Sequence, residues 1–350
     1  MCRSIAVVTL LYLIAFRTDA QVPTDRRDSL RNTYIKRYPD RFFIWPVLKH
    51  RSLSFDVTSD RKADDRLSFS PNNTYSFGVG AYLFDVSAEV SLSIPLDEKS
   101  RGRYGSSEAR DFSTSLLGTN WSIDVFIQHY ESFYLSNPAK AVPSNQSYPL
   151  RPDIHLTNFG ANGVYVFDRN KFSLWSAYNF SERQLKSRGS AMLAWTVNNV
   201  HLTADSVVLS APYLVRLNTQ TNFRDVRYAT FSIAPGYSYN LVWRKIFLNV
   251  SLAVGPAHHW VYYVGSDGVG HYDIAINSFV DGRLALGYSS DRWFGGITFV
   301  SQARTVKFEE ITLDTQSQSF RMLIGYRIME KGFLQKSWRD FVPKGIRRYL

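Results

Sequence analysis

Histidine and aspartate residues gather near position 260 and are the first candidates for chemistry. His258 and His259 are followed closely by Asp267, His271 and Asp273. Imidazole and carboxylate groups can ligate a cation, or serve as the base and the orienting group of a nucleophile. The chain lacks a His-x-x-x-His pair on a helix and a Gly-x-Ser-x-Gly elbow, the usual zinc-protease and hydrolase spacings. We therefore predict no catalytic residue, no metal site and no cofactor, with an enzyme such as a lipase or protease as the alternative.

Seven charged residues fall on the polar faces of segments in which polar and apolar side chains alternate. They are Glu89, Asp111, Asp124, Arg183, Arg283, Arg321 and Arg327. If these segments are barrel strands, a lipid-facing Arg or Lys would cost roughly 2–4 kcal/mol, so these charges are expected to face the lumen. Acidic groups of the first half and arginines of the second could pair there. Such pairs would either plug the lumen as a salt-bridge network or set the selectivity of a pore.

The segments that must position these charges have the length and the period of membrane-crossing strands. Residues 121–130, 246–256 and 319–328 each alternate polar and apolar side chains over about ten residues, enough for a tilted strand to cross a bilayer. Large aromatic residues such as Trp121, Trp243 and Trp293 lie next to the short connections, which is typical of an interfacial girdle. Soluble β-sandwiches also alternate, so strand length and aromatic placement favour the membrane.

The connections between these segments switch regularly between short and long. Short ones are expected at 85, 119–120, 168–170, 198–199, 241–245 and 289–292, and long ones at 60–74, 96–108, 135–153, 184–189, 209–227, 262–274 and 305–318. A transmembrane barrel has this rhythm, with tight turns on the periplasmic side and longer loops outside.

The segments number fourteen and predict an all-β fold. They are 52–59, 75–84, 86–95, 109–118, 121–134, 154–167, 171–183, 190–197, 200–208, 228–240, 246–261, 275–288, 293–304 and 319–328. Twelve to sixteen strands are compatible with the pattern, because Phe42–Leu48 could add or extend a strand and the pair 190–197 and 200–208 is short. We predict an antiparallel up-and-down transmembrane β-barrel over residues 52–328, with short periplasmic turns and long extracellular loops.

Both ends of the chain differ from the middle. Residues 1–20 have the pattern of a signal peptide cut after Ala20, and they contain Cys2, the only cysteine. The mature chain therefore forms no disulfide and no cysteine zinc site. Most of the net charge of +11 lies in two basic periplasmic segments, 21–51 and 329–350, whereas residues 52–328 hold 25 basic and 24 acidic groups. Because the fold itself carries no basic face, nucleic acid is not an expected partner.

Several short motifs are similar to those of one uncharacterised family. They are Arg110-Asp111-Phe112, Asn120-Trp121-Ser122-Ile123-Asp124, Gln128-His129-Tyr130, Phe133-Tyr134, Arg151-Pro152-Asp153-Ile154, Tyr178 through Leu185, and Pro235-Gly236-Tyr237-Ser238-Tyr239-Asn240. Over most of the mature chain the sequence resembles the domain of unknown function 4421 family of Gram-negative bacteria. The resemblance implies secretion and an outer-membrane barrel, and it supplies no activity and no catalytic residue.

The sequence therefore predicts location better than function. We expect a protein of the cell outer membrane, either a channel for small solutes or a structural or surface barrel. An outer-membrane enzyme at the outer rim and a soluble secreted β-barrel or sandwich that binds a partner are the alternatives. The expected partners are outer-membrane lipids and the barrel-assembly machinery, with small solutes if the lumen is open.

Overall fold

In the computed structural model, residues 24–73, 75–83 and 86–329 are described, and they form strands almost throughout. The predicted leader at 1–20 and all but one residue of the predicted tail at 329–350 lie outside this part. The strands are β1 (Ile35–Arg37), β2 (Arg41–Ser59), β3 (Lys62–Ser70), β4 (Ser76–Leu83), β5 (Val86–Ser93), β6 (Glu108–Leu117), β7 (Trp121–Leu135), β8 (Leu150–Val166), β9 (Glu182–Gln184), β10 (Arg188–Ala204), β11 (Phe223–Trp243), β12 (Ile246–Gly265), β13 (Gly270–Ser289), β14 (Trp293–Phe308) and β15 (Ile311–Met329). The helices are α2 (Thr24–Tyr34), α3 (Glu98–Tyr104), α4 (Trp175–Tyr178) and α5 (Ala211–Leu217).

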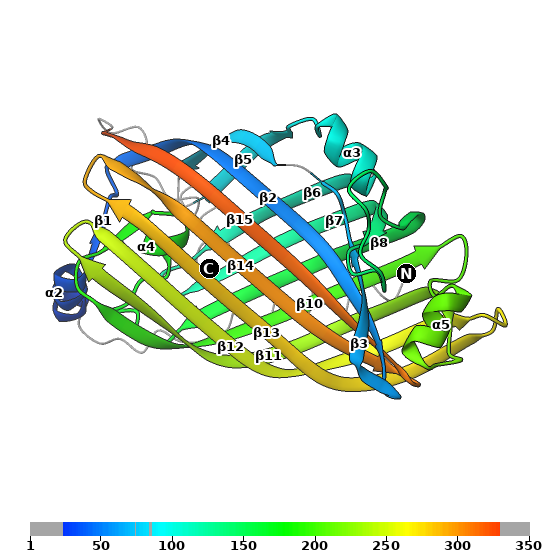
Figure 1. The fold of residues 1–350 in the computed structure, drawn as a ribbon. Helices are drawn as coiled ribbons and strands as arrows, with labels where there is room; N and C mark the ends of the chain where they lie inside the picture. Colours follow the sequence, from blue (N-terminus) through cyan, green and yellow to red (C-terminus); the bar gives the residue numbers. More distant parts are fainter. Residues whose placement is uncertain (1–23, 74, 84–85, 330–350) are drawn as a thin grey trace, which may run out of the picture.

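Twelve of the described strands close into an antiparallel ring, which confirms the predicted barrel. The ring runs β2, β4, β5, β6, β7, β8 and then β10 to β15, and β15 returns to β2 through a register from Ile311↔Ser59 to Met329↔Arg41. The strands tilt across the barrel, as Figure 1 shows. Strand β3 is an additional strand that bridges from β2 to β7 at one end. We call that end the long-loop end, and the opposite end, where β2 begins and β15 finishes, the short-turn end.

Alternation along each strand separates an apolar outer wall from a largely polar interior. On β12, Val250, Leu252 and Val254 are about half exposed on the outside, whereas Asn249 and Ser251 are buried inside. This is the reverse of a water-soluble fold, where the apolar residues would be inside. An apolar outer band over many strands is what a hydrocarbon environment requires.

Two predicted strand assignments are wrong. Residues 171–183 are not a wall strand. They form α4 and part of β9 inside the short-turn end, and their alternation comes from burial of Phe172, Leu174 and Phe180 against the lumen wall. Residues 190–208 do not form a hairpin, because β10 runs straight through Asn198-Asn199. Asn198 faces the polar lumen, where its side-chain amide donates a hydrogen bond to Asn158 Oδ1 at 2.7 Å. This bond satisfies the polar side chain within a strand, so the asparagine does not mark a turn here.

The strands at the long-loop end reach farther than the sequence indicated. The connection expected at 262–274 narrows to residues 266–269, and the one at 305–318 narrows to Glu309-Glu310. At the other end β2 begins at Arg41, before the predicted barrel start at residue 52, so Phe42–Leu48 extends a strand as one alternative had it. The wall strands β12 to β15 are therefore longer at the long-loop end than the sequence predicted.

Candidate functional site

The barrel interior holds a cavity of about 220 Å³ near its middle. Wall strands β2, β5, β6, β7, β8, β13, β14 and β15 line it, together with Trp175 and Tyr178 from the segment inside the short-turn end. Four of the predicted lumen charges, Glu89, Asp124, Arg283 and Arg321, line this cavity. Asp111 lies beside it through its contact with Arg51, a lining residue. These five charges therefore lie on the inner face of the wall in this structure.

Two cationic side chains, Arg321 and Lys49, contact the single carboxylate of Glu89. Its Oε1 accepts hydrogen bonds from Arg321 Nη1 at 3.0 Å and from the indole Nε1 of Trp45 at 2.9 Å. Lys49 Nζ lies 3.9 Å from the other carboxylate oxygen. Trp45 and Lys49 come from β2 and Arg321 from β15, so the contacts tie β5 to the strands across the interior. The local charge is therefore positive by one.

A second carboxylate, Asp111 on β6, is also held by β2. Arg51 Nη1 donates to its Oδ1 at 2.5 Å, and Gln128 Nε2 donates to its Oδ2 at 3.1 Å. Arg51 also donates to the hydroxyl of Ser113 on the same strand. Charge-assisted bonds of this kind are short and directional, so they fix β6 against the interior.

A third cluster contains residues that the sequence analysis missed. Asp281 is almost fully buried and accepts from Arg283 Nε at 2.8 Å, from Arg283 Nη2 at 2.9 Å and from Gln302 Nε2 at 2.9 Å. Arg304, also buried, reaches Thr196 Oγ1 at 3.1 Å and lies over the ring of Phe279. Asp281 lies two residues before Arg283 on β13, so the alternation of that strand would have found it. Arg304 is on β14 and shares the inward face of Gln302.

The remaining two predicted lumen charges lie at the short-turn end, away from the cavity. Arg183 is on β9 and lies 3.5 Å from Asp291 Oδ1. Lys36 Nζ contacts the same oxygen at 2.8 Å, and this bond holds the pKa of Asp291 below its ordinary value. Arg327 is 1% exposed and donates from Nη2 to the carbonyl of Phe180 at 2.8 Å, and from Nη1 to the carbonyl of Ser290.

A folded segment fills the lumen at the short-turn end. We call residues 167–187, between β8 and β10, the plug; they include α4 and β9. Its apolar side chains pack on small inward residues of the wall, namely Ala194, Ala234, Ala253 and Ala257. Trp175 Nε1 donates to the carbonyl of Gly118 at 2.9 Å, and the Tyr178 hydroxyl donates to Asn249 Oδ1 at 2.7 Å. Wall residues thus form specific bonds with the plug.

The N-terminal segment fastens the plug from outside. Strand β1 pairs with β9 from Ile35↔Gln184 to Arg37↔Glu182, and Arg31 Nη2 contacts Glu182 Oε1 at 2.6 Å. Figure 1 shows α2 and β1 together at the left end, the short-turn end. The predicted basic segment at 21–51 thus contributes a closing element and the first part of β2.

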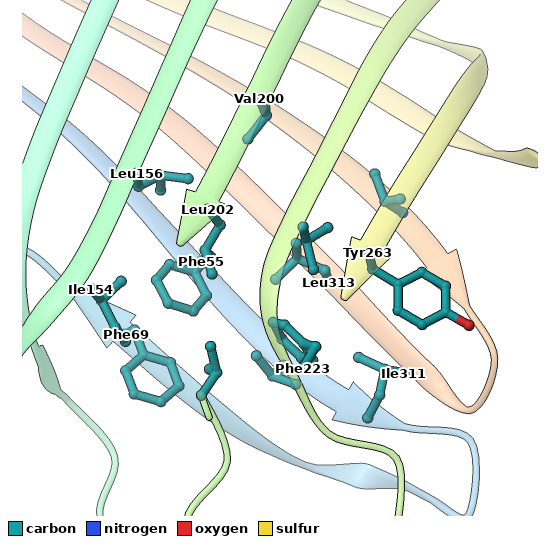
Figure 2. Packing of buried hydrophobic residues seen from close by; sticks show 14 of the residues in the cluster. Phe55, Phe69, Ile154, Leu156, Val200, Leu202, Phe223, Tyr263, Ile311 and Leu313 are labelled. Atoms are coloured by element: carbon teal, nitrogen blue, oxygen red, sulfur yellow. The ribbon is translucent and has the colours of Figure 1, made fainter. Parts of the chain in front are cut away.

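The long-loop end is closed by a large apolar cluster, which we call the outer layer. Side chains from strands on opposite sides of the barrel converge there, including Phe55, Leu156, Leu202, Phe223 and Leu313 (Figure 2). These five side chains are 0–1% exposed, and close-packed apolar side chains leave no room for a water-filled path.

Helix α5 is clamped over the outer layer. Arg216 forms hydrogen bonds with both carboxylate oxygens of Asp65 on β3, and this holds the pKa of Asp65 below its ordinary value. Leu217, the last residue of α5, is buried in the outer layer.

The barrel wall is sparsely paired between β5 and β6. β5 and β6 share only two residue pairs, Val86↔Leu116 and Ser87↔Ser115, whereas β5 pairs with β4 along its whole length and β6 with β7 along its own. We call the unpaired stretch, 88–93 facing 108–114, the seam. Glu89 and Ser113 line the cavity from its two sides. Unpaired backbone groups in hydrocarbon cost several kcal/mol each, so the seam is a weak line in the described wall.

The histidines near position 260 are not brought together. His258 faces outward beside Trp260, whereas His259 is buried in the lumen and shares a 2.9 Å hydrogen bond with Thr230. The ring of His271 stacks on Tyr263, and Asp267 accepts from the backbone N–H of Val269 in the turn. His258 and His259 thus lie on opposite faces of β12, whereas Asp267 and His271 line one pocket at the long-loop end together with Glu309 and Glu310.

No helix in the part of the chain that the structure describes is long and apolar enough to span a bilayer.

Comparisons with known proteins identify one matching family and several similar structures. A family model for a domain of unknown function, DUF4421, matches residues 26–328. Similar solved structures include the outer membrane protease OmpT from Escherichia coli, with 8% identity, 83% of this chain and 97% of that chain covered, and a TM-score of 0.41. The translocator domain of the autotransporter NalP from Neisseria meningitidis has 8% identity, coverage of 87% and 94%, and a TM-score of 0.33. No curated protein matches the sequence.

Proposed function

Since this chain belongs to the domain of unknown function 4421 family and folds as an antiparallel barrel with an apolar outer wall, we propose that it is an outer-membrane barrel closed to passage along its axis. The observation that carries the proposal is closure at both ends of the lumen. The outer layer fills one end, and the plug fills the other. A structural or surface barrel fits this interior better than a channel does. Its partners would be outer-membrane lipids and the machinery that assembles barrels.

Conductance tests this proposal directly. The purified protein, inserted into planar lipid bilayers, is expected to give no current steps above the background of detergent alone, because no aqueous path crosses the two apolar layers. Insertion is verified separately by protease protection and by heat-modifiable migration on a gel. Stable ohmic steps from inserted wild-type protein would overturn the proposal in favour of the channel.

The seam favours a second candidate function, the binding of an amphiphile that enters from the bilayer. Outward residues on its two sides, including Val90, Leu92 and Phe112, are strongly exposed and apolar. The cavity behind them presents Lys49 and Arg321 against the single carboxylate of Glu89. An acidic head group could join these bases while its acyl chain leaves through the seam, which suits a cavity too small for a whole lipid.

A disulfide across the seam should abolish such binding. The double variant Ala88→Cys/Thr114→Cys continues the β5–β6 register by one pair and would hold the strands together. We expect it to weaken binding of a fluorescent fatty acid at least tenfold when oxidised, and a reducing agent should restore the binding. The control Ala81→Cys/Ala88→Cys joins β4 to β5 at a pair that already exists, and it should leave binding unchanged. Equal binding by the oxidised seam variant and the control would exclude lateral entry.

A further inference from the structure

Three side chains that can ligate a metal meet on the outside of the barrel. His129 and Glu131 point outward from β7, and His155 points outward from β8. Along the outer faces of β7 and β8, the last exposed apolar residues before this cluster are Ile127 and Phe159. The cluster therefore lies where the apolar band gives way to polar residues, on the side of the long-loop end.

Strand register brings these side chains together. Glu131 is directly opposite His155, and His129 is directly opposite Thr157. Since residues two apart on a strand share a face, the four side chains form one compact outward patch on paired residues of β7 and β8, directly before the bulge between Glu131 and Phe133. A site built on paired strands is held more rigidly than one on a loop.

The distances fit a cation with small adjustments. His129 Nε2 lies 2.7 Å and His155 Nδ1 lies 3.7 Å from Glu131 Oε1, and the three ligand atoms all fall within 4.8 Å of one another. A zinc ion bound at about 2.0–2.2 Å to each would separate its ligand atoms by roughly 3.4 Å. Changes of up to about 1.4 Å in these separations, shared between partly exposed side chains, would reach that arrangement.

One hydrogen bond already orients the first histidine for this role. His129 Nδ1 lies 2.8 Å from the hydroxyl of Thr157. Metal-bound histidines usually donate their second ring N–H to an oxygen, which fixes the tautomer and leaves the other nitrogen to the metal. When Nδ1 donates to Thr157, the other ring nitrogen, Nε2, points toward Glu131. Loss of the proton between Nε2 and the Glu131 carboxylate would free the Nε2 lone pair for a metal ion.

We propose that His129, Glu131 and His155 form a binding site for one divalent transition-metal ion, with zinc as the ion that suits the ligands. The two imidazoles favour zinc and other transition-metal ions over calcium or magnesium, which prefer oxygen ligands, and a carboxylate is a common third ligand of zinc. Three protein ligands leave a coordination position open to water or to an oxygen of a neighbouring molecule. The site is independent of the cavity and requires only that the barrel fold.

A second histidine–carboxylate group on the same outer surface provides a matched control. His201 Nε2 lies 3.3 Å from Asp225 Oδ1, and its neighbours are again outward residues of paired strands. Here Arg227 donates to both His201 Nε2 and Asp225, so a guanidinium already occupies the position that a metal ion would take. This group offers no third metal ligand, and we expect it to bind no ion.

The test is metal titration of the leaderless protein, refolded in detergent and carrying no histidine tag. Calorimetry with zinc chloride is expected to give one ion per chain, and Co²⁺ should give the visible absorption of a low-coordinate site. His129→Gln, Glu131→Gln and His155→Gln should each weaken binding at least tenfold, and His129→Gln/His155→Gln should remove it. His201→Gln should bind as wild type does.

Each contrary outcome overturns the proposal. No saturable zinc binding by folded wild-type protein would do so, as would unchanged binding in His129→Gln/His155→Gln. Equal losses in His201→Gln and His129→Gln would mean that the ion binds surface histidines without a defined site. Heat-modifiable migration of every variant confirms that the barrel has folded, so loss of binding cannot be mistaken for misfolding.

Discussion

Replacing Arg327 with alanine is expected to lower the free energy of unfolding by about 3 kcal/mol, because the substitution empties the centre of the short-turn end. The guanidinium lies 4.2 Å from the ring centroid of Tyr38, 4.7 Å from that of Phe294 and 5.0 Å from that of Phe43. It also donates to carbonyls of the plug and of the turn before β14. Alanine would leave a cavity between the rings and two buried carbonyls without this donor.

The measurement is the temperature of heat-modifiable migration, together with the urea midpoint in lipid vesicles. Arg327→Lys should lose part of the stability, since an ammonium is a point charge that cannot contact all three rings and both carbonyls at once. Arg183→Ala is the control. Arg183 was also a predicted lumen charge, but its ion pair with half-exposed Asp291 should be worth less than about 1 kcal/mol. Equal losses of stability in the Arg183 and Arg327 variants would contradict this role of Arg327.

The inner and outer faces of the wall could be predicted from the sequence because alternation has a strict physical cause. Glu89 and Arg321 lie 232 residues apart and still form an ion pair, since both occupy inward positions of their strands. Along a regular strand, an even spacing from an inward residue identifies the next one, and this covers Asp281, two residues before Arg283. The spacing fails at bulges such as the one between Glu131 and Phe133. Elsewhere the cost of a lipid-facing charge enforces the rule.

The plug could not be predicted in the same way. Residues 171–183 alternate because they pack between a lumen wall and their own neighbours, and this pattern is indistinguishable from that of a wall strand. The same limit applies to Asn198-Asn199, which has the composition of a turn but bonds to other lumen amides. The cluster of His129, Glu131 and His155 depends on the register of β7 against β8, and local sequence does not specify that register.

Removing the plug is expected to open the central cavity to water from the short-turn end. Because β8 and β10 are already paired up to Val166↔Met192, residues 169–189 can be replaced by Asn-Gly, a sequence suited to a tight hairpin. The only natural cysteine is Cys2, in the predicted leader, so a single reporter can be added to the mature protein. Ser122→Cys places it at a cavity-lining position that is 3% exposed.

We expect a membrane-impermeant maleimide to modify this cysteine at least tenfold faster in the plug-deleted protein than in the protein that retains the plug. The reason is that Trp175 and Tyr178 cover the cavity on that side, whereas the outer layer still blocks the other. For the same reason the plug-deleted barrel should remain silent in planar bilayers. Val215→Cys, 81% exposed on α5, should react equally in both backgrounds.

Unchanged protection of the Ser122→Cys thiol would mean that the wall, and not the plug, closes the short-turn end. Conductance after plug removal would instead show that the outer layer does not seal the lumen, and the barrel would then be a channel that the plug gates.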